Sequence, residues 1–109
     1  MAIPELTNAQ RKEALAKAKA ARETRAEAKR RLAAGEISIG ELLDSDDPAI
    51  GRMKVSELLR AVYGVGKARA DAALRKMRIA DTRRLAGLGP RQRAELIEFV
   101  EQREARHAE

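Results

Sequence analysis

Two glycines that flank one apolar residue, Gly64-Val65-Gly66, constrain the fold of this chain more than any other feature. Helical apolar patterns stand on both sides of this triplet. Gly64 can adopt the left-handed conformation that ends a helix, and Gly66 lets the backbone come close to a ligand where the next helix begins. We expect Val65 to turn inward between them. The triplet therefore predicts a helix-hairpin-helix.

The second helix of this hairpin would point its N-terminus at solvent. The first backbone N–H groups of a helix have no intrahelical partner, and they lie at the positive end of the helix dipole. Lys67 and Arg69 add full positive charges beside them. Such an arrangement favours a phosphate as ligand.

A second triplet, Gly87-Leu88-Gly89, follows in the most basic part of the chain, where residues 51–94 hold 12 basic and 3 acidic side chains. Asp81 is expected to cap a short helical turn before it, and Pro90 suits the first turn of a last helix that ends near residue 104. Two such turns in tandem predict two backbone sites for neighbouring phosphates. The predicted contacts around them are Gly64, Val65, Gly66, Lys67, Arg69, Arg83, Arg84, Gly87, Gly89, Arg91 and Arg93.

A long helix is predicted over residues 8–34, because Thr7 and Gln10 form a capping box and Gly35 provides a stop. At 100° per residue its charges separate by sign. The basic stripe holds Arg11, Arg22, Arg25 and Lys29, with Glu13, Glu23 and Glu27 on the opposite side. We expect the C-terminal end to dock and the basic stripe of Arg22, Arg25 and Lys29 to follow a phosphate backbone. A solvated charged helix or a weak coiled coil is the alternative.

The segment between these regions is acidic, with five acidic and no basic residues over residues 36–50. Ser38 and Glu41 form a second capping box, and Asp47 can cap a turn that begins with Pro48. The acidic spacing does not fit an EF-hand, so we interpret these carboxylates as caps and expect no metal. The sequence thus predicts an all-α fold in one domain, 1–109, with a basic helix over 8–34, short capped helices over 36–53 and a tandem-hairpin region over 54–104.

Composition favours a polyanionic partner, since Lys plus Arg number 23 against 17 Asp plus Glu and the formal net charge is +6. The absence of cysteine excludes disulfides, thiol catalysis and cysteine-rich zinc sites. No stretch approaches the roughly 18 apolar residues of a membrane span. We therefore expect a cytoplasmic protein without a cofactor or a membrane partner.

The leading function is sequence-tolerant binding of duplex DNA through phosphates. RNA or ribosome binding is the alternative, although Tyr63 and Phe99, the two aromatic residues, offer few platforms for stacking unpaired bases. A third class is a protein-interaction helix without a nucleic-acid role. Lys67 and Asp81 superficially fit a base-excision glycosylase, but a flipped base needs a stacking pocket. With His107 expected to be solvated, we predict no enzymatic activity.

The chain resembles the actinobacterial integration host factor family over nearly its whole length. The resemblance lies in Met53-Lys54-Val55-Ser56 through Gly64-Val65-Gly66-Lys67, and in Thr82-Arg83-Arg84-Leu85 with Gly87-Leu88-Gly89. It implies an all-helical fold with a helix-two-turn-helix, as in ribosomal S13-like proteins. It also implies a nucleoid-associated protein that binds and bends duplex DNA and assists phage integration.

The same resemblance implies double-stranded DNA as partner, a phage integrase as a further one, and a monomer in solution. DNA contacts would come from the first hairpin, from Arg83 and Arg84, and from the basic helix. Two residues depart from the family pattern. Relatives often carry a basic residue in place of Ala86 and proline in place of Tyr63, which predicts a weaker arginine cluster and a less rigid hairpin entry.

Overall fold

The computed structural model describes residues 7–62 and 64–108, with side chains through residue 104. Tyr63 and the chain start before Thr7 lie outside the described residues. The elements are α1 (Asn8–Ala33), α2 (Ile39–Leu43), α3 (Pro48–Gly51), α4 (Val55–Ala61), α5 (Gly66–Met77), the 3-10 turn η1 (Leu85–Gly87) and α6 (Pro90–Ala108). The described residues form helices and no β-strand beyond an isolated bridge, and the predicted all-α class is confirmed.

Both ends of α1 form as the sequence predicts. The Gln10 N–H donates to Thr7 Oγ1 (3.1 Å), and the Thr7 N–H donates to Gln10 Oε1 (2.9 Å), which completes the capping box. At the other end Gly35 is left-handed, with φ +75°. The Glu36 N–H donates to the Arg31 carbonyl (2.8 Å), as in a Schellman motif. The helix therefore ends one residue before its predicted limit.

Side-chain caps also define the two short helices. The Glu41 N–H donates to Ser38 Oγ (3.1 Å), and this hydroxyl donates to the Glu41 carboxylate (3.2 Å). In a full capping box the carboxylate would instead accept from the backbone N–H of Ser38. Asp47 Oδ1 accepts from the Ala49 N–H (2.9 Å), and Pro48 opens α3. The acidic residues singled out as caps thus include one confirmed cap, Asp47.

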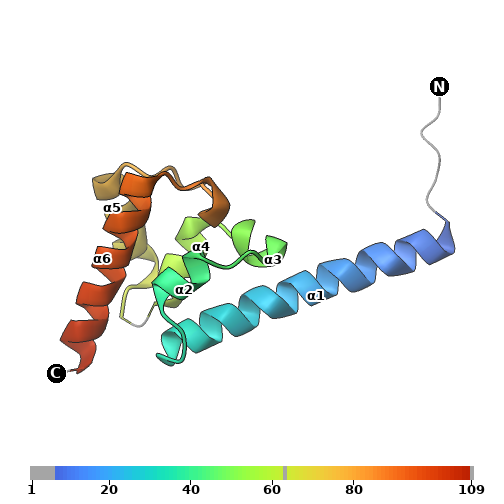
Figure 1. Cartoon of the computed structure of the whole chain (residues 1–109), viewed down its shortest axis with the longest axis horizontal. Helices are drawn as coiled ribbons and strands as arrows, with labels where there is room; N and C mark the ends of the chain where they lie inside the picture. The colour runs from blue at the N-terminus through green and yellow to red at the C-terminus, as the bar shows by residue number, and fades with distance from the viewer. Residues whose placement is uncertain (1–6, 63, 109) are drawn as a thin grey trace.

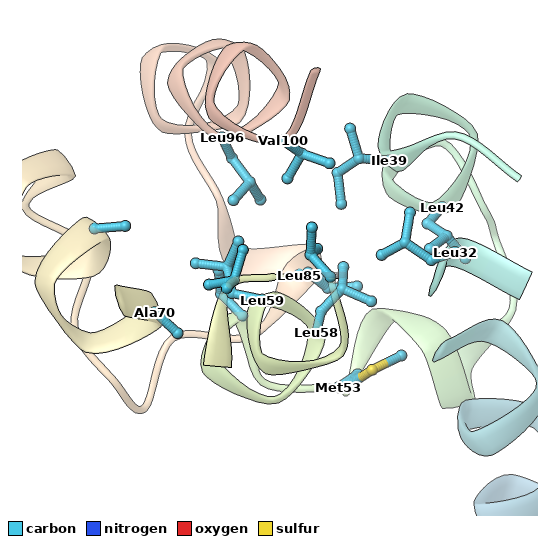
Figure 2. Close-up of a cluster of buried hydrophobic side chains, with 14 of the residues drawn as sticks. Leu32, Ile39, Leu42, Met53, Leu58, Leu59, Ala70, Leu85, Leu96 and Val100 are labelled. Atoms are coloured by element: carbon cyan, nitrogen blue, oxygen red, sulfur yellow. The ribbon is translucent and has the colours of Figure 1, made fainter. Parts of the chain in front are cut away.

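The core is arranged around α4, whose Val55, Leu58 and Leu59 are fully buried. Leu96 and Val100 point from α6 toward this helix (Figure 2), and both are also fully buried. The other buried apolar residues of the cluster are Ala28, Leu32, Ile39, Leu42, Met53, Val62, Val65, Ala70, Ala73, Leu74, Ile79 and Leu85. The residues of this cluster come from every described helix except α3. With the three fully buried side chains of α4 among them, they form one core.

Only the C-terminal end of α1 reaches this core. Ala28 and Leu32 are buried, whereas every residue from Asn8 to Ala20 is exposed. Figure 1 shows the helix extending away from the other helices, and the longest dimension of the chain is 57 Å. The prediction that α1 docks through its C-terminal end and projects its N-terminal half is confirmed.

The last helix is longer than the sequence suggests. It continues to Ala108, four residues beyond the predicted limit at residue 104, and the side chain of His107 lies outside the described residues. Within the described part of the chain, no helix combines the length and the apolar character that crossing a membrane requires.

Candidate nucleic-acid interface

The hairpin between α4 and α5 has the predicted left-handed Gly64, but α4 ends earlier than predicted, at Ala61, where the extended Val62 follows. Gly64 and Gly66 are both left-handed, with φ +78° and φ +67°. Val65 between them is only 4% exposed, so it anchors the turn in the core. The Val65 N–H donates to the carbonyl of Val62 (3.1 Å). Val62 is the last described residue before the turn.

The N-terminus of α5 is left open to a ligand. Within the described residues no side chain caps this helix, and its first turn contains no acidic residue. Lys67 and Arg69 are exposed beside it. Uncapped amides at the positive end of a helix dipole, with two cations beside them, are features that favour an anion.

Two arginines converge on the carbonyl of Gly64. Arg69 Nη1 donates to this oxygen at 2.9 Å, and Arg103 Nη2, from α6, donates to it at 2.9 Å as well. Arg103 was not among the predicted contacts, because nothing in its local pattern marks a partner 39 residues away. The hairpin is therefore held from α5 and from α6 together.

The second triplet does not repeat this geometry, which corrects the expectation of a duplicate phosphate cradle. Neither Gly87 nor Gly89 has a positive φ. The Gly87 N–H donates to the Arg84 carbonyl (2.9 Å), and the Gly89 N–H donates to Gln92 Oε1 (3.3 Å). Both N–H groups therefore already have partners inside the chain.

The turn before η1 is also held differently from the prediction. Asp81 does not cap it: η1 begins after Arg84 without a side-chain cap, and the Arg83 N–H donates to the Ala80 carbonyl (2.9 Å). The Asp81 carbonyl instead accepts from the buried Ser56 hydroxyl (3.3 Å). That bond fixes the loop to the start of α4.

An isolated antiparallel bridge joins this loop to the segment before α4, with Lys54 opposite Arg84. The Val55 N–H donates to the Arg83 carbonyl and the Leu85 N–H to the Met53 carbonyl, both at 2.9 Å. The Arg84 guanidinium also donates to the Arg52 carbonyl. This bridge gathers four exposed basic residues, here named the bridge cluster: Arg52, Lys54, Arg83 and Arg84.

Arg52 and Lys54 were absent from the predicted contacts. The signal that could have found them is the density of basic residues on both sides of α4, but their pairing with Arg83 and Arg84 depends on tertiary structure. Arg83 is further restrained, because its Nη1 donates to the Gly87 carbonyl (3.2 Å).

One residue of the basic stripe of α1, Arg25, shares a groove with a member of the bridge cluster, Arg52. Arg25 and Lys17 line a groove of about 460 Å³ with Arg52, the residue that joins this groove to the bridge cluster. Arg22 is exposed on the same helix. The structure thus places Arg25 of the predicted stripe near Arg52, which connects α1 with the bridge cluster.

Lys29 occupies a different environment from the rest of the stripe. Its Nζ lies 2.9 Å from Glu57 Oε1, so it ties α1 to α4. On the acidic side of α1, a hydrogen bond from Arg30 holds the pKa of Glu27 below its usual value. The acidic side of α1 thus also carries cations, since Glu27 pairs with Arg30 and Glu13 with Lys17, and the predicted separation holds only for the basic stripe.

The two predicted arginines of α6, Arg91 and Arg93, also differ in whether they are exposed or tie helices together. Arg91 is 83% exposed and pairs with Glu95 at 3.2 Å on its own helix. Arg93 donates to the Leu43 carbonyl (3.3 Å) and pairs with Asp44, which ties α6 to the end of α2. Arg91 is thus open to a ligand, whereas Arg93 already has two partners.

Lys67 and Asp81 line one cavity of about 410 Å³, together with Arg60 and Asp71. Arg60 and Asp71 pair across it at 3.6 Å. The residues described around this cavity include no aromatic side chain that could stack on a flipped base. In the same described residues no group of histidine and acidic side chains could hold a metal ion.

Comparison with known proteins gives a consistent result. A model of the S13-like H2TH domain matches residues 32–99. The integration host factor of Mycolicibacterium smegmatis is 49% identical over 104 residues, which cover 94% of this chain and 99% of the relative. That of Mycobacterium tuberculosis is 49% identical over 100 residues, covering 90% and 95%.

A solved structure supports the same assignment. The structure of sIHF bound to an 8bp palindromic DNA has a TM-score of 0.75 and 42% sequence identity, and covers 77% of this chain and 97% of that one. The resemblance drawn from the sequence is therefore confirmed. This chain, with its S13-like H2TH domain, belongs to the integration host factor family.

Proposed function

We propose that this protein is a nucleoid-associated protein that binds duplex DNA through its phosphates, with little sequence preference. The observation that carries the proposal is the open N-terminus of α5 behind the left-handed Gly64 and Gly66, flanked by Lys67 and Arg69. The DNA-bound relative supports a duplex as the partner. The region over residues 54–104 would make most of the contacts.

The bridge cluster and the basic side of α1 would form a second contact area, with Arg22 and Arg25 beside Arg52, Lys54, Arg83 and Arg84. Two basic areas on one small protein can bend a single duplex or bridge two. Bending a site of 20–30 base pairs costs on the order of 1–6 kcal/mol, which the added phosphate contacts would have to offset. Gly87, Gly89 and Arg91 would contribute at the margin of this area, while Arg93 and Lys29 mainly hold helices together.

The protein would act without catalysis and without a cofactor, in the bacterial cytoplasm on the nucleoid. Compaction of the chromosome and support of site-specific recombination, including phage integration, follow from bending or bridging. RNA binding is the alternative function, and a comparison of nucleic-acid ligands distinguishes it from binding to duplex DNA.

Binding to duplex DNA, duplex RNA and single-stranded DNA of equal length is compared by fluorescence anisotropy at matched salt. We expect duplex DNA to bind most tightly, with an affinity that falls steeply as salt rises, because phosphate contacts release counterions. Tighter binding to duplex RNA would overturn the proposal. A duplex labelled at both ends reports bending, and an unchanged end-to-end distance at saturation would leave bridging as the mode of action.

A further inference from the structure

Arg103 connects the last helix to the hairpin that we propose to bind phosphate. Its Nη2 donates to the Gly64 carbonyl at 2.9 Å, across 39 residues of sequence. Its Nε is buried, with no hydrogen-bond partner among the described residues. One nitrogen of the guanidinium is thus shielded from solvent and another is bonded to the hairpin, which disfavours a role mainly as a phosphate ligand.

The peptide group that follows Gly64 is restrained at both of its polar atoms. Its oxygen accepts from Arg103 and from Arg69 Nη1 (2.9 Å each), and its N–H, which belongs to Val65, donates to the Val62 carbonyl (3.1 Å). The buried Val65 side chain adds a third restraint. The plane of this peptide is thus fixed, although glycine on one side of it could adopt many conformations.

The orientation of this peptide determines where the next amides point. Gly66 and Lys67 follow directly, and their N–H groups form the open end of α5. A rotation of the Gly64–Val65 peptide would turn these amides away from their common direction. Pre-organised donors bind an anion more tightly than donors that must be ordered on binding.

We propose that Arg103 is a positioning residue for DNA binding, which acts through the Gly64 carbonyl rather than through a phosphate. This inference rests on the proposed function of the hairpin. It also assigns a role to Arg69, whose Nη1 shares the same carbonyl, so that its side chain stays beside the hairpin amides. The end of α6 would then contribute to affinity without lying on the duplex.

The test uses the full chain with Arg103→Lys, which keeps the charge and most of the stem but removes the planar fork. Arg30→Gln is the control, because it removes a cation from the side of α1 opposite the basic stripe, where Arg30 pairs with Glu27. Two quantities are measured: the exchange rate of the Val65 amide in the free protein, by NMR, and the affinity for a duplex as a function of salt. The exchange of the Leu59 amide, buried in the core, corrects for any change in global stability.

We expect Val65 to exchange about tenfold faster in Arg103→Lys, the loss expected for one charge-assisted hydrogen bond. Affinity would fall severalfold while the slope of log affinity against log salt stays that of the wild type. Arg30→Gln would leave the Val65 exchange rate unchanged. An unchanged Val65 exchange rate in Arg103→Lys, or an affinity equal to that of the wild type, would overturn the inference.

The charge itself is tested by Arg103→Gln, which removes the cation. A positioning role predicts the same salt slope as in the wild type, whereas a lost phosphate contact would lower the slope by about 1 and would also overturn the inference. Failure of the wild type to bind duplex DNA would refute the proposed function instead. The exchange rate, measured without DNA, separates that failure from a failure of the positioning role.

Discussion

Lys54 and Arg84 face each other across a backbone bridge, so two cations distant in sequence become immediate neighbours. The bridge is built by main-chain bonds of the residues beside them, and both side chains remain exposed. Two adjacent like charges at a surface repel each other when the protein is free. A polyanion relieves that repulsion, which favours phosphate at this position.

Replacing Arg84 by Gln should weaken binding to duplex DNA and lower the salt slope by about 1, because one phosphate contact is lost. The measurement is a salt titration of affinity by anisotropy. Arg30→Gln carries the same change of charge and should keep the wild-type slope, since Arg30 pairs with Glu27 and Glu36 away from the bridge cluster. Equal slopes for the wild type and Arg84→Gln would contradict a phosphate contact at Arg84.

Lys29 and Glu57 should behave as a structural pair. The two side chains are about one-third and two-fifths exposed, so solvent screens the pair, and we expect a coupling of about 0.5–1 kcal/mol in a double-mutant cycle of Lys29→Gln and Glu57→Gln. Urea unfolding measures it. The salt slope of DNA binding should be unchanged in Lys29→Gln; a slope lowered by about 1 would show that Lys29 contacts DNA.

The two glycine triplets should respond differently to alanine. Gly66→Ala places a side chain at φ +67°, where nothing crowds a Cβ, so the cost is conformational and about 1 kcal/mol. Gly89 has no positive φ, and a Cβ there would meet only Gln92 Oε1 at 4.0 Å. Gly89→Ala should therefore change the free energy of unfolding by less than about 0.5 kcal/mol. A loss at Gly89 as large as at Gly66 would refute the distinction between the turns.

Leu15 and Leu32 provide a matched pair within one helix. Leu32 is 3% exposed, and Leu32→Ala should destabilise the fold by about 2–5 kcal/mol. Leu15 is 69% exposed, and Leu15→Ala should change stability by no more than about 0.5 kcal/mol. Thermal or urea unfolding tests both. A large effect at Leu15 would mean that the N-terminal half of α1 has a partner.

Local signals in the sequence predicted the helices well. The caps at Thr7 and Asp47 and the stop at Gly35 depend on residues within a few positions of one another, and the structure confirms them. Gly64 is left-handed as predicted, but α4 already ends at Ala61. The basic stripe of α1 follows from helical geometry alone, although cations pair with the glutamates on the other side. These features need no knowledge of tertiary packing.

Contacts between distant segments, and the conformation of the second glycine triplet, could not be predicted from local patterns. The second glycine triplet matches the first in letters, but its glycines have no positive φ, and their N–H groups bond to the Arg84 carbonyl and to Gln92 Oε1. Arg93 and Lys29 looked like free cations until packing placed Asp44 and Glu57 beside them. Arg103 was missed for the same reason, since only the return of α6 brings it to Gly64.

The exposed half of α1 also has a thermodynamic consequence. Residues 8–20 are all exposed, so their helix–coil equilibrium depends mainly on the Thr7 cap, on local propensity and on the Glu13–Lys17 pair. The excess of cations in this segment, Arg11, Lys12, Lys17 and Lys19 against one glutamate, opposes the helix. Phosphates that neutralise those cations would shift the equilibrium toward helix. The length of this arm is therefore coupled to its ligand, and far-UV circular dichroism would record DNA binding as a gain in helicity.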